Sequence, residues 1–276
     1  MTDFFSYDKE TLLKHARFPL TILETEQMVF KSIADDMIRT IEENNKKQET
    51  TVCIVPVGPV GQYPFFVEAV NKEQVSLKNT YFINMDEYLD DEDEYLPTNH
   101  RLSFRGFMTR EVYQKIDPAL VMDESHRIFP DPKHPQAVDT LITELGKIDV
   151  CYGGIGINGH LAFNEPEDVS IEDFASRSTR VLAISKETRT INSVGDLNGA
   201  IQAMPKRCVT IGMNQILSSR RIVLGCFRTW HRAVIRQALC QDPNAMFPST
   251  LLQNHGNASL LVPATVAEPA YTKMIL

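Results

Sequence analysis

Residues 149–166 read DVCYGGIGINGHLAFNEP, a short apolar run that passes directly into a glycine-rich segment carrying polar side chains. Short apolar runs that are rich in β-branched residues and bounded by turn residues predict buried strands. Similar runs recur at residues 51–57, 81–85, 179–184, 208–213, 221–227 and 258–262. Residues 149–155 therefore predict one strand of a larger sheet, followed by a loop at its carboxyl end.

Helical patterns lie between several of these runs. Residues 24–45 carry Met28, Val29, Ile33, Met37 and Ile41 at three- and four-residue spacing, and residues 62–71, 134–145 and 229–240 show the same period. Strands that alternate with helices of this length predict a mostly parallel sheet covered on both faces. We therefore expect an α/β fold, a three-layer sandwich with a Rossmann-like central sheet. Because no linker or repeat divides the chain, we expect residues 1–276 to form a single domain.

The composition argues against several classes of partner. The 276 residues include 28 Lys and Arg against 36 Asp and Glu, which gives a net charge of −8 at pH 7. Nucleic acids and anionic membranes bind basic faces, so we expect neither as a partner. The sequence has no membrane-length apolar stretch, charges interrupt its N-terminal segment, and its five cysteines form no CxxC pair. These features predict a reduced, cytoplasmic protein without a cysteine metal site.

Polar side chains follow several of the predicted strands. Asp86 and Glu87 follow the run at 81–85, His160 and Glu165 follow the run at 149–155, and Arg228 follows the run at 221–227. In open parallel sheets, ligands bind beyond the carboxyl ends of the strands, so these residues predict a polar small-molecule site. Adjacent residues of a strand point to opposite faces. We therefore expect only one of the two neighbouring carboxylates to enter the site and choose Asp86.

Gly154, Gly156 and Gly159 match the spacing of a dinucleotide-binding loop, but too few residues precede Pro166 for the helix that would hold a pyrophosphate. We expect these glycines instead to let the backbone approach a ligand and to present His160 and Glu165. A histidine in such a loop is often only structural, but the carboxylate five residues later favours an oriented His–carboxylate pair. No second matched histidine lies nearby, so we expect no metal.

At these residues the chain resembles the glucosamine-6-phosphate deaminase (isomerase) family, in the larger group that includes 6-phosphogluconolactonase. The motifs that carry the resemblance are NMDEY at 84–88, GGIGINGHLAFNEP at 153–166, MPK at 204–206 with VTIGM at 209–213, and PSTLLQNH at 248–255. The FNEP ending is typical of the deaminase side of the group. The resemblance implies isomerisation and deamination of an amino-sugar phosphate, with no metal and no cofactor.

The resemblance also implies roles for individual residues. Asp86 moves a proton between C2 and C1 of the open-chain sugar, His160 takes and returns the proton that opens the ring, and Glu165 supports that histidine. The chain has Asn158 where the family has an aspartate two residues before the histidine. An amide orients an imidazole but does not stabilise its charged form, so we expect Glu165 to take over part of that role.

The phosphate site departs from the family as well. Residues 57–61 read VGPVG where the family has a hydroxyl-rich turn, and Val194 stands in the place of a phosphate-binding arginine. Arg228 corresponds to the family's phosphate-binding lysine and keeps its positive charge. The expected substrate-binding residues are Gly58, Val60, Gly61, Glu87, Gly159 and Arg228.

Two alternatives to the deaminase stay open. One is a related sugar lactone hydrolase or an isomerase of another substrate. The other is a non-catalytic sugar-phosphate sensor, which Asn158, Val60 and Val194 would favour. In each case the expected partner is a small sugar or sugar phosphate. Because some family members are hexamers, a homo-oligomer stays open. Residues 166–169 lack the paired serines of the family's regulatory site, so the resemblance does not extend to that regulation.

Overall fold

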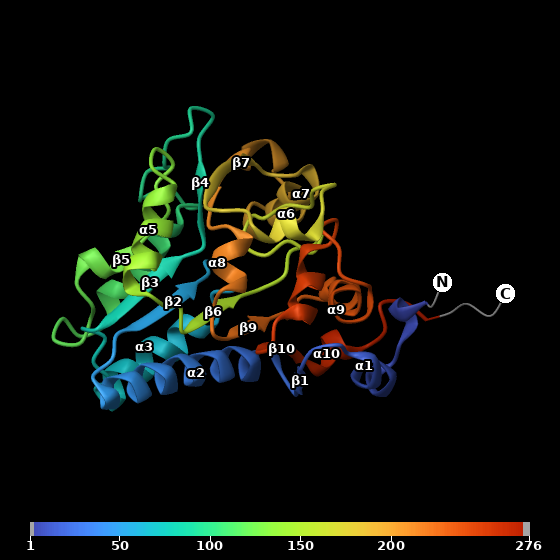
Figure 1. The fold of residues 1–276 in the computed structure, drawn as a ribbon, viewed down its shortest axis with the longest axis horizontal. Helices are drawn as coiled ribbons and strands as arrows, with labels where there is room; N and C mark the ends of the chain where they lie inside the picture. Colours follow the sequence, from blue (N-terminus) through green and yellow to red (C-terminus); the bar gives the residue numbers. More distant parts are fainter. Residues whose placement is uncertain (1–2, 273–276) are drawn as a thin grey trace.

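Within residues 3–272, which the computed structural model describes, seven parallel strands form the middle layer of the molecule (Figure 1). Their order is β1-β10-β9-β6-β2-β3-β5, and each neighbouring pair is parallel. The strands are β1 (Leu20–Leu23), β2 (Thr51–Val55), β3 (Thr80–Asn84), β5 (Arg127–Ile128), β6 (Val150–Gly153), β9 (Ile222–Gly225) and β10 (Ala258–Pro263).

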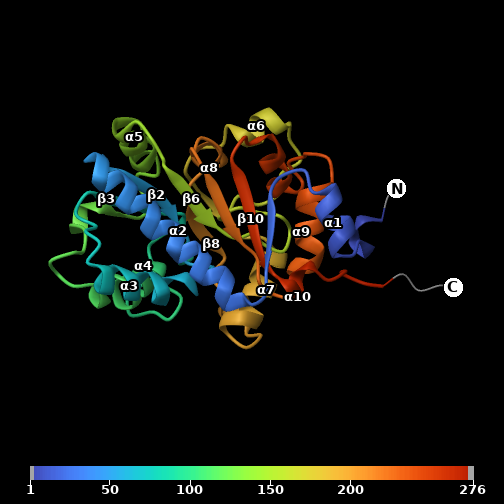
Figure 2. The ribbon, with the colours of Figure 1, turned by 90° about the horizontal axis from the view of Figure 1, so that it is seen from below.

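Helices cover both faces of this sheet (Figures 1 and 2). On one face lie α2 (Glu26–Lys47), α3 (Gln62–Glu73) and α4 (Phe104–Glu111), and on the other lie α5 (Gln136–Leu145), α8 (Met213–Leu217) and α9 (His231–Cys240). The remaining helices are α1 (Lys9–His15), α6 (Ile171–Ala175), α7 (Lys186–Asp196) and α10 (Ala264–Ala267). The predicted α/β three-layer sandwich is confirmed.

Alternation along the strands divides the core into two layers. Cys53 and Val55 of β2 pack in the same apolar cluster as α2 and α3, whereas Val52 and Ile54 pack in the cluster on the opposite face. All four side chains are fully buried, as expected of a strand covered by helices on both sides. This arrangement explains why the run at 51–57 is continuously apolar rather than alternating.

A second, smaller sheet stands beside the parallel one and is antiparallel throughout. It consists of β4 (Asp86–Leu89), β8 (Arg207–Thr210) and β7 (Arg180–Ala183), in that order. The predicted strands at 179–184 and 208–213 therefore belong to this sheet, and Asp86 begins a strand rather than ending one. The second sheet has its own small core, which includes Tyr88, Phe163 and Cys208.

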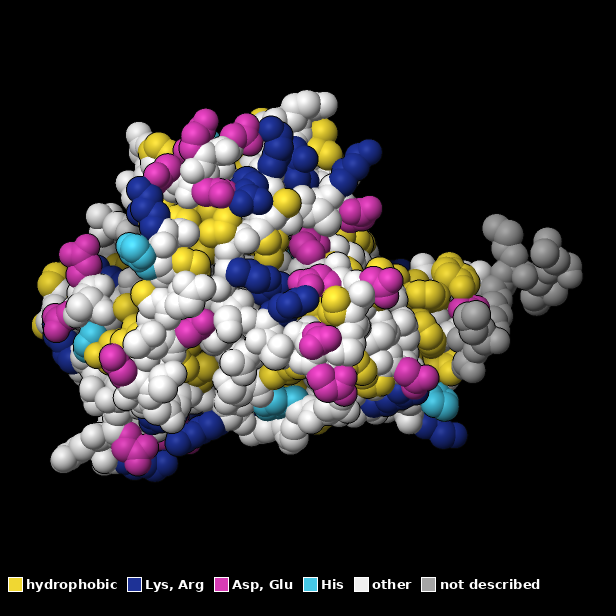
Figure 3. Space-filling view, turned by 45° about the horizontal axis from the view of Figure 1, so that its top comes forward, with side chains coloured by type: hydrophobic (Ala, Val, Ile, Leu, Met, Phe, Trp, Pro, Cys, Tyr) yellow, Lys and Arg dark blue, Asp and Glu magenta, His cyan; other side chains and the backbone are white. Residues whose placement is uncertain are grey.

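The outer surface carries charges of both signs. Figure 3 shows basic and acidic side chains interspersed on one face of the molecule. None of the helices within residues 3–272 is long and apolar enough to cross a membrane. That residues 1–276 form a single domain stays a prediction.

Candidate active site

A cavity of about 640 Å³ lies at the carboxyl edge of the parallel sheet, and residues of β4 and α7 complete its wall. Six of the residues expected from the sequence line it: Gly58, Val60 and Gly61 after β2, Asp86 at the start of β4, His160 after β6, and Arg228 after β9. The carboxylate, the imidazole and the guanidinium thus lie on one cavity, where the ends of the parallel strands bring them.

Glu87 does not line this cavity, which corrects the expectation that it binds substrate. Its side chain is fully buried, and its carboxylate accepts hydrogen bonds from the backbone N–H groups of Phe104 (2.9 Å) and Arg105 (2.8 Å). Because neighbouring strand residues point to opposite faces, Asp86 enters the cavity and Glu87 turns away from it. Glu87 instead anchors the first turn of α4.

Gly159 also lies outside the cavity lining, so its expected contact with substrate is corrected as well. Its φ of +85° favours glycine, and a Cβ at this position would lie 2.6 Å from the ring of Phe247. Gly159 therefore serves the turn that carries His160. Gly156 lies closer to the chemistry, because a Cβ there would stand 2.0 Å from atoms of the His160 ring. The imidazole packs directly against the bare backbone of Gly156.

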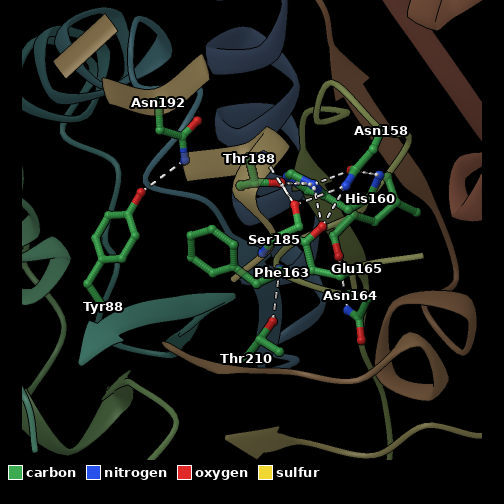
Figure 4. Close-up of polar contacts among 11 residues, drawn as sticks. Tyr88, Asn158, His160, Phe163, Asn164, Glu165, Ser185, Thr188, Asn192 and Thr210 are labelled. Carbon is green, nitrogen blue, oxygen red and sulfur yellow. Dashed lines mark hydrogen bonds and ion pairs between the residues drawn. The ribbon is translucent and has the colours of Figure 1, made fainter. Parts of the chain in front are cut away.

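Asn158 joins His160 to Glu165 (Figure 4). Its Oδ1 lies 2.8 Å from Nδ1 of His160, and its Nδ2 donates to Oε2 of Glu165 at 2.6 Å. An ionised carboxylate only accepts hydrogen bonds, so the amide must turn its NH₂ toward Glu165 and its oxygen toward His160. Because an amide oxygen only accepts hydrogen bonds, Nδ1 of His160 carries the ring proton and donates it to Asn158 Oδ1. Nε2 is therefore the unprotonated nitrogen of the neutral ring, which can accept a proton.

We call the hydrogen-bonded series His160–Asn158–Glu165 the relay. Glu165 supplies its negative charge. Burial by itself would raise the pKa of Glu165, but the neighbouring His160, together with the hydrogen bond from Asn158, lowers it to about 2. The backbone N–H of Ser185, the residue that caps the start of α7, donates to Oε1 of Glu165 at 3.1 Å. The charge lies 3.7 Å from Nδ1 of His160, so the relay stabilises an imidazolium through an intervening amide.

The loop that carries Glu165 is held against the second sheet. The backbone N–H of Phe163 donates to Oγ1 of Thr210 in β8 at 3.1 Å (Figure 4). Nδ2 of Asn164 donates to the carbonyl of Ile211 at 3.0 Å. These bonds fix the FNEP segment relative to β8, so the side chain of Glu165 reaches the relay from a rigid support.

Asp86 is the second group in the cavity that can transfer a proton. It is only 8% exposed, and its burial, together with the neighbouring charge of Glu87, raises the pKa of Asp86 to about 8. A carboxyl group with a pKa in this range both takes and returns protons near neutral pH. Asp86 and His160 are therefore two proton-transfer groups of different chemistry that line the same space.

Several residues of the site were not found from the sequence. Arg101 and Asp196 line the cavity, as do Tyr88 and Asn192, whose Nδ2 donates to the Tyr88 hydroxyl at 2.9 Å (Figure 4). His231 accepts a hydrogen bond at Nδ1 from the backbone N–H of Arg228 (2.9 Å), while its Nε2 lies 3.0 Å from the Ile155 carbonyl. Burial above all lowers the pKa of His231 to about 3, so its neutral ring joins the Arg228 loop to the Ile155 loop.

Two further residues beside Glu165 had a local signal in the sequence. Ser185 and Thr188 follow the spacing of a helix cap, SKET at residues 185–188. That spacing predicts the start of α7 but not its contact with Glu165. Within the described part of the chain, no three His, Cys, Asp or Glu side chains are grouped as metal ligands.

Comparison with known proteins finds many relatives of one kind. The chain is 31% identical over 232 residues to a glucosamine-6-phosphate deaminase of Aliivibrio salmonicida, covering 80% of this chain and 81% of that protein. It is 26% identical over 253 residues to a protein of the same name from Mycoplasma mycoides, covering 90% of this chain and 96% of the relative. No protein-family model matches the chain.

Solved structures give the same picture at the level of the fold. A monomeric glucosamine-6-phosphate deaminase of the NagB superfamily aligns with a TM-score of 0.79 and 25% identity, over 91% of this chain and 99% of that one. A 6-phosphogluconolactonase from Trypanosoma brucei aligns with a TM-score of 0.65 at 14% identity, over 90% and 97% of the two chains. The second similarity extends to the fold alone.

Proposed function

The chain belongs to the glucosamine-6-phosphate deaminase family, and from that premise we propose that it converts glucosamine 6-phosphate, or a close amino-sugar phosphate, into a ketose phosphate and ammonia. The chain is an enzyme of the deaminase and isomerase type. The observation that carries the specific proposal is that Asp86 and His160 line one cavity, with His160 oriented by the Asn158–Glu165 relay.

Ring opening is assigned to His160. Its free Nε2 takes the proton from the C1 hydroxyl as the bond between C1 and the ring oxygen breaks, and the ring oxygen receives a proton in return. The imidazolium formed in between keeps its Nδ1 proton on Asn158, and the charge of Glu165 stabilises it from 3.7 Å. General acid–base catalysis of this kind contributes about 10²–10⁴-fold to the rate.

Proton transfer between carbons is assigned to Asp86. Its carboxylate takes the proton from C2 of the open-chain amino aldehyde and returns it at C1, while the C1 carbonyl oxygen gains a proton and the amino group loses one. The product of this step has a hydroxyl at C1 and an imine at C2. Water then adds to that carbon and ammonia leaves, so the sum is amino-sugar phosphate and water giving ketose phosphate and ammonia. The ammonium group of a bound amino sugar lies next to C2 and would favour the ionised form of a carboxyl group whose pKa is raised to about 8.

The test is to measure ammonia and ketose phosphate released from glucosamine 6-phosphate by the wild type, Asp86→Asn and His160→Asn. We expect equimolar products from the wild type and a loss of at least about 100-fold in each variant. Asp91→Asn is the matched control, since Asp91 is an exposed carboxylate paired with Lys206 outside the cavity. A folded wild type that releases no ammonia, or an Asp86→Asn variant with unchanged turnover, would overturn the proposal.

A lactone hydrolase is the second candidate, and one observation favours it. An oriented histidine such as His160 can activate a water molecule for attack on a lactone without a second proton-transfer group. Such an enzyme has no proton to move between carbons. A lactone hydrolase would hydrolyse 6-phosphogluconolactone in a reaction that requires His160 but not Asp86. Binding of sugar phosphates without any turnover would instead indicate a sensor.

A further inference from the structure

Two arginines from different loops reach the cavity beside the last residues of α7. Arg101, in the segment before α4, donates from Nη2 to the main-chain carbonyl of Asp196 at 2.5 Å. The guanidinium of Arg228 lies against Gly195, where a Cβ would stand 3.7 Å from both of its Nη atoms. All four residues line the cavity. Two positive charges are therefore gathered at one end of one helix.

These charges are not neutralised by a direct ion pair. Among the described residues, neither Arg101 nor Arg228 has a carboxylate oxygen within 4.0 Å of its side-chain nitrogens. The nearby carboxyl group is that of Asp196, whose pKa is raised by burial and lowered by the charges of Arg228 and Arg101. One acidic group beside two guanidiniums leaves a net positive patch on the cavity wall.

We propose that Arg101 is a second substrate-binding residue, which forms with Arg228 a two-guanidinium site for the phosphate group of the substrate. The inference rests on the proposed function, because that function supplies a phosphorylated sugar. A phosphate accepts two parallel hydrogen bonds from each guanidinium, and such charge-assisted bonds are among the strong ones in proteins.

The sequence around α7 explains why a second loop supplies this charge. Val194 stands where the family resemblance implies a phosphate-binding arginine, and its side chain is 61% exposed. Arg101 reaches the same end of α7 from 95 residues away in the chain and is held there by the Asp196 carbonyl. A guanidinium at a helix C-terminus is also a common structural contact that stabilises the helix. A residue that binds phosphate affects only phosphorylated ligands, whereas a structural residue affects all ligands alike, so selectivity for phosphate distinguishes the two roles.

The experiment uses two unreactive open-chain probes, sorbitol 6-phosphate and sorbitol, titrated calorimetrically into wild type, Arg101→Ala, Arg101→Lys and Arg228→Ala. We expect Arg101→Ala to weaken binding of the phosphorylated probe about ten- to a hundredfold and to leave binding of sorbitol unchanged. Arg101→Lys, which keeps the charge, restores most of the loss. The KM for the amino-sugar phosphate should be lowest in the wild type, higher in Arg101→Lys and highest in Arg101→Ala.

Arg110→Ala is the matched control, because Arg110 donates to the Thr98 carbonyl at 2.8 Å in the same manner but does not line the cavity. The inference is overturned if Arg101→Ala binds sorbitol 6-phosphate as the wild type does, or if it loses both probes equally, which indicates a structural role. A wild type that does not distinguish the two probes overturns the phosphorylated substrate itself. If Arg101→Ala fails to fold, Arg101→Gln decides between the same outcomes.

Discussion

Exchanging the amide of Asn158 with the carboxylate of Glu165 tests how His160 becomes a base. Glu165→Gln alone removes the charge that lies 3.7 Å from Nδ1 of His160. At an effective dielectric constant of about 20, a charge at that distance stabilises the imidazolium by about 4.5 kcal/mol. We therefore expect ring opening to slow about 10³-fold in this variant.

Asn158→Asp alone is a different perturbation. It places a second carboxylate oxygen where Nδ2 now donates to Glu165 at 2.6 Å. Two ionised carboxylates at that distance repel each other by about 6 kcal/mol at the same dielectric constant, so the pair takes up one proton. The relay keeps a single negative charge, and we expect little change in turnover at neutral pH, with a loss of stability as the pH rises and the shared proton leaves.

The double variant, Asn158→Asp with Glu165→Gln, restores a matched pair. The glutamine NH₂ donates to the introduced carboxylate, which then lies 2.8 Å from Nδ1 instead of 3.7 Å. The shorter distance strengthens the attraction by about 1.4 kcal/mol at a dielectric constant of about 20, so ring opening should be up to tenfold faster than in the wild type.

The assay is turnover of the cyclic amino-sugar phosphate at pH 7, with thermal unfolding to verify that each variant is folded. Full activity in Glu165→Gln would show that Glu165 does not support His160. If turnover of the double variant is no faster than that of Glu165→Gln, a negative charge at position 158 does not replace the one at position 165. Either result refutes the relay through Asn158.

Three further changes test other parts of the site. Because the folded pKa of Asp86, about 8, lies above its ordinary value of 3.8, the folded state holds a proton that the unfolded chain releases, and this group lowers stability as the pH rises from about 4 to 8. Asp86→Asn should therefore raise the free energy of unfolding by at most about 4 kcal/mol at pH 7 and by less at pH 5, in urea titrations; an equal gain at both values would contradict the assignment. In Gly156→Ala the new Cβ would lie 2.0 Å from atoms of the His160 ring, so the ring must move and turnover should fall about 100-fold. Gly256→Ala is the control, because nothing lies within 4 Å of a Cβ there and turnover should not change. Equal activities of the two variants would show that Gly156 does not position His160. His231→Phe leaves the Arg228 N–H and the Ile155 carbonyl without their partner, so we expect a loss of about 1–3 kcal/mol of stability and weaker binding of sorbitol 6-phosphate, and unchanged binding would mean that His231 does not position Arg228.

The strand-end residues were predictable from the sequence because they follow from periodicity alone. Apolar runs mark the strands, parallel strands end at one edge, and Asp86, His160 and Arg228 follow such runs. Alternation also predicted correctly that only one of Asp86 and Glu87 enters the cavity. It did not predict what Glu87 does, because α4 begins only at Phe104 and its first turn has no local link to Glu87.

The remaining parts of the site depend on contacts that no local pattern encodes. Apolar alternation in β7 and β8 predicts strands but does not say that they form a separate antiparallel sheet. Arg101 and Asp196 lie 95 residues apart and meet only because α7 packs beside the segment before α4. Residues brought together by packing of this kind are found from the structure rather than from motif spacing.

The central claim is that Asp86 and His160 act on one amino-sugar phosphate in one cavity, and a substrate deuterated at C2 tests it most directly. The fate of the label is followed by NMR while ammonia is measured in the same sample. The account predicts that the label leaves C2, to C1 or to solvent, in step with equimolar ammonia, and that Asp86→Asn abolishes both. Ammonia release with the label retained at C2, or loss of the label that persists in Asp86→Asn, would contradict it.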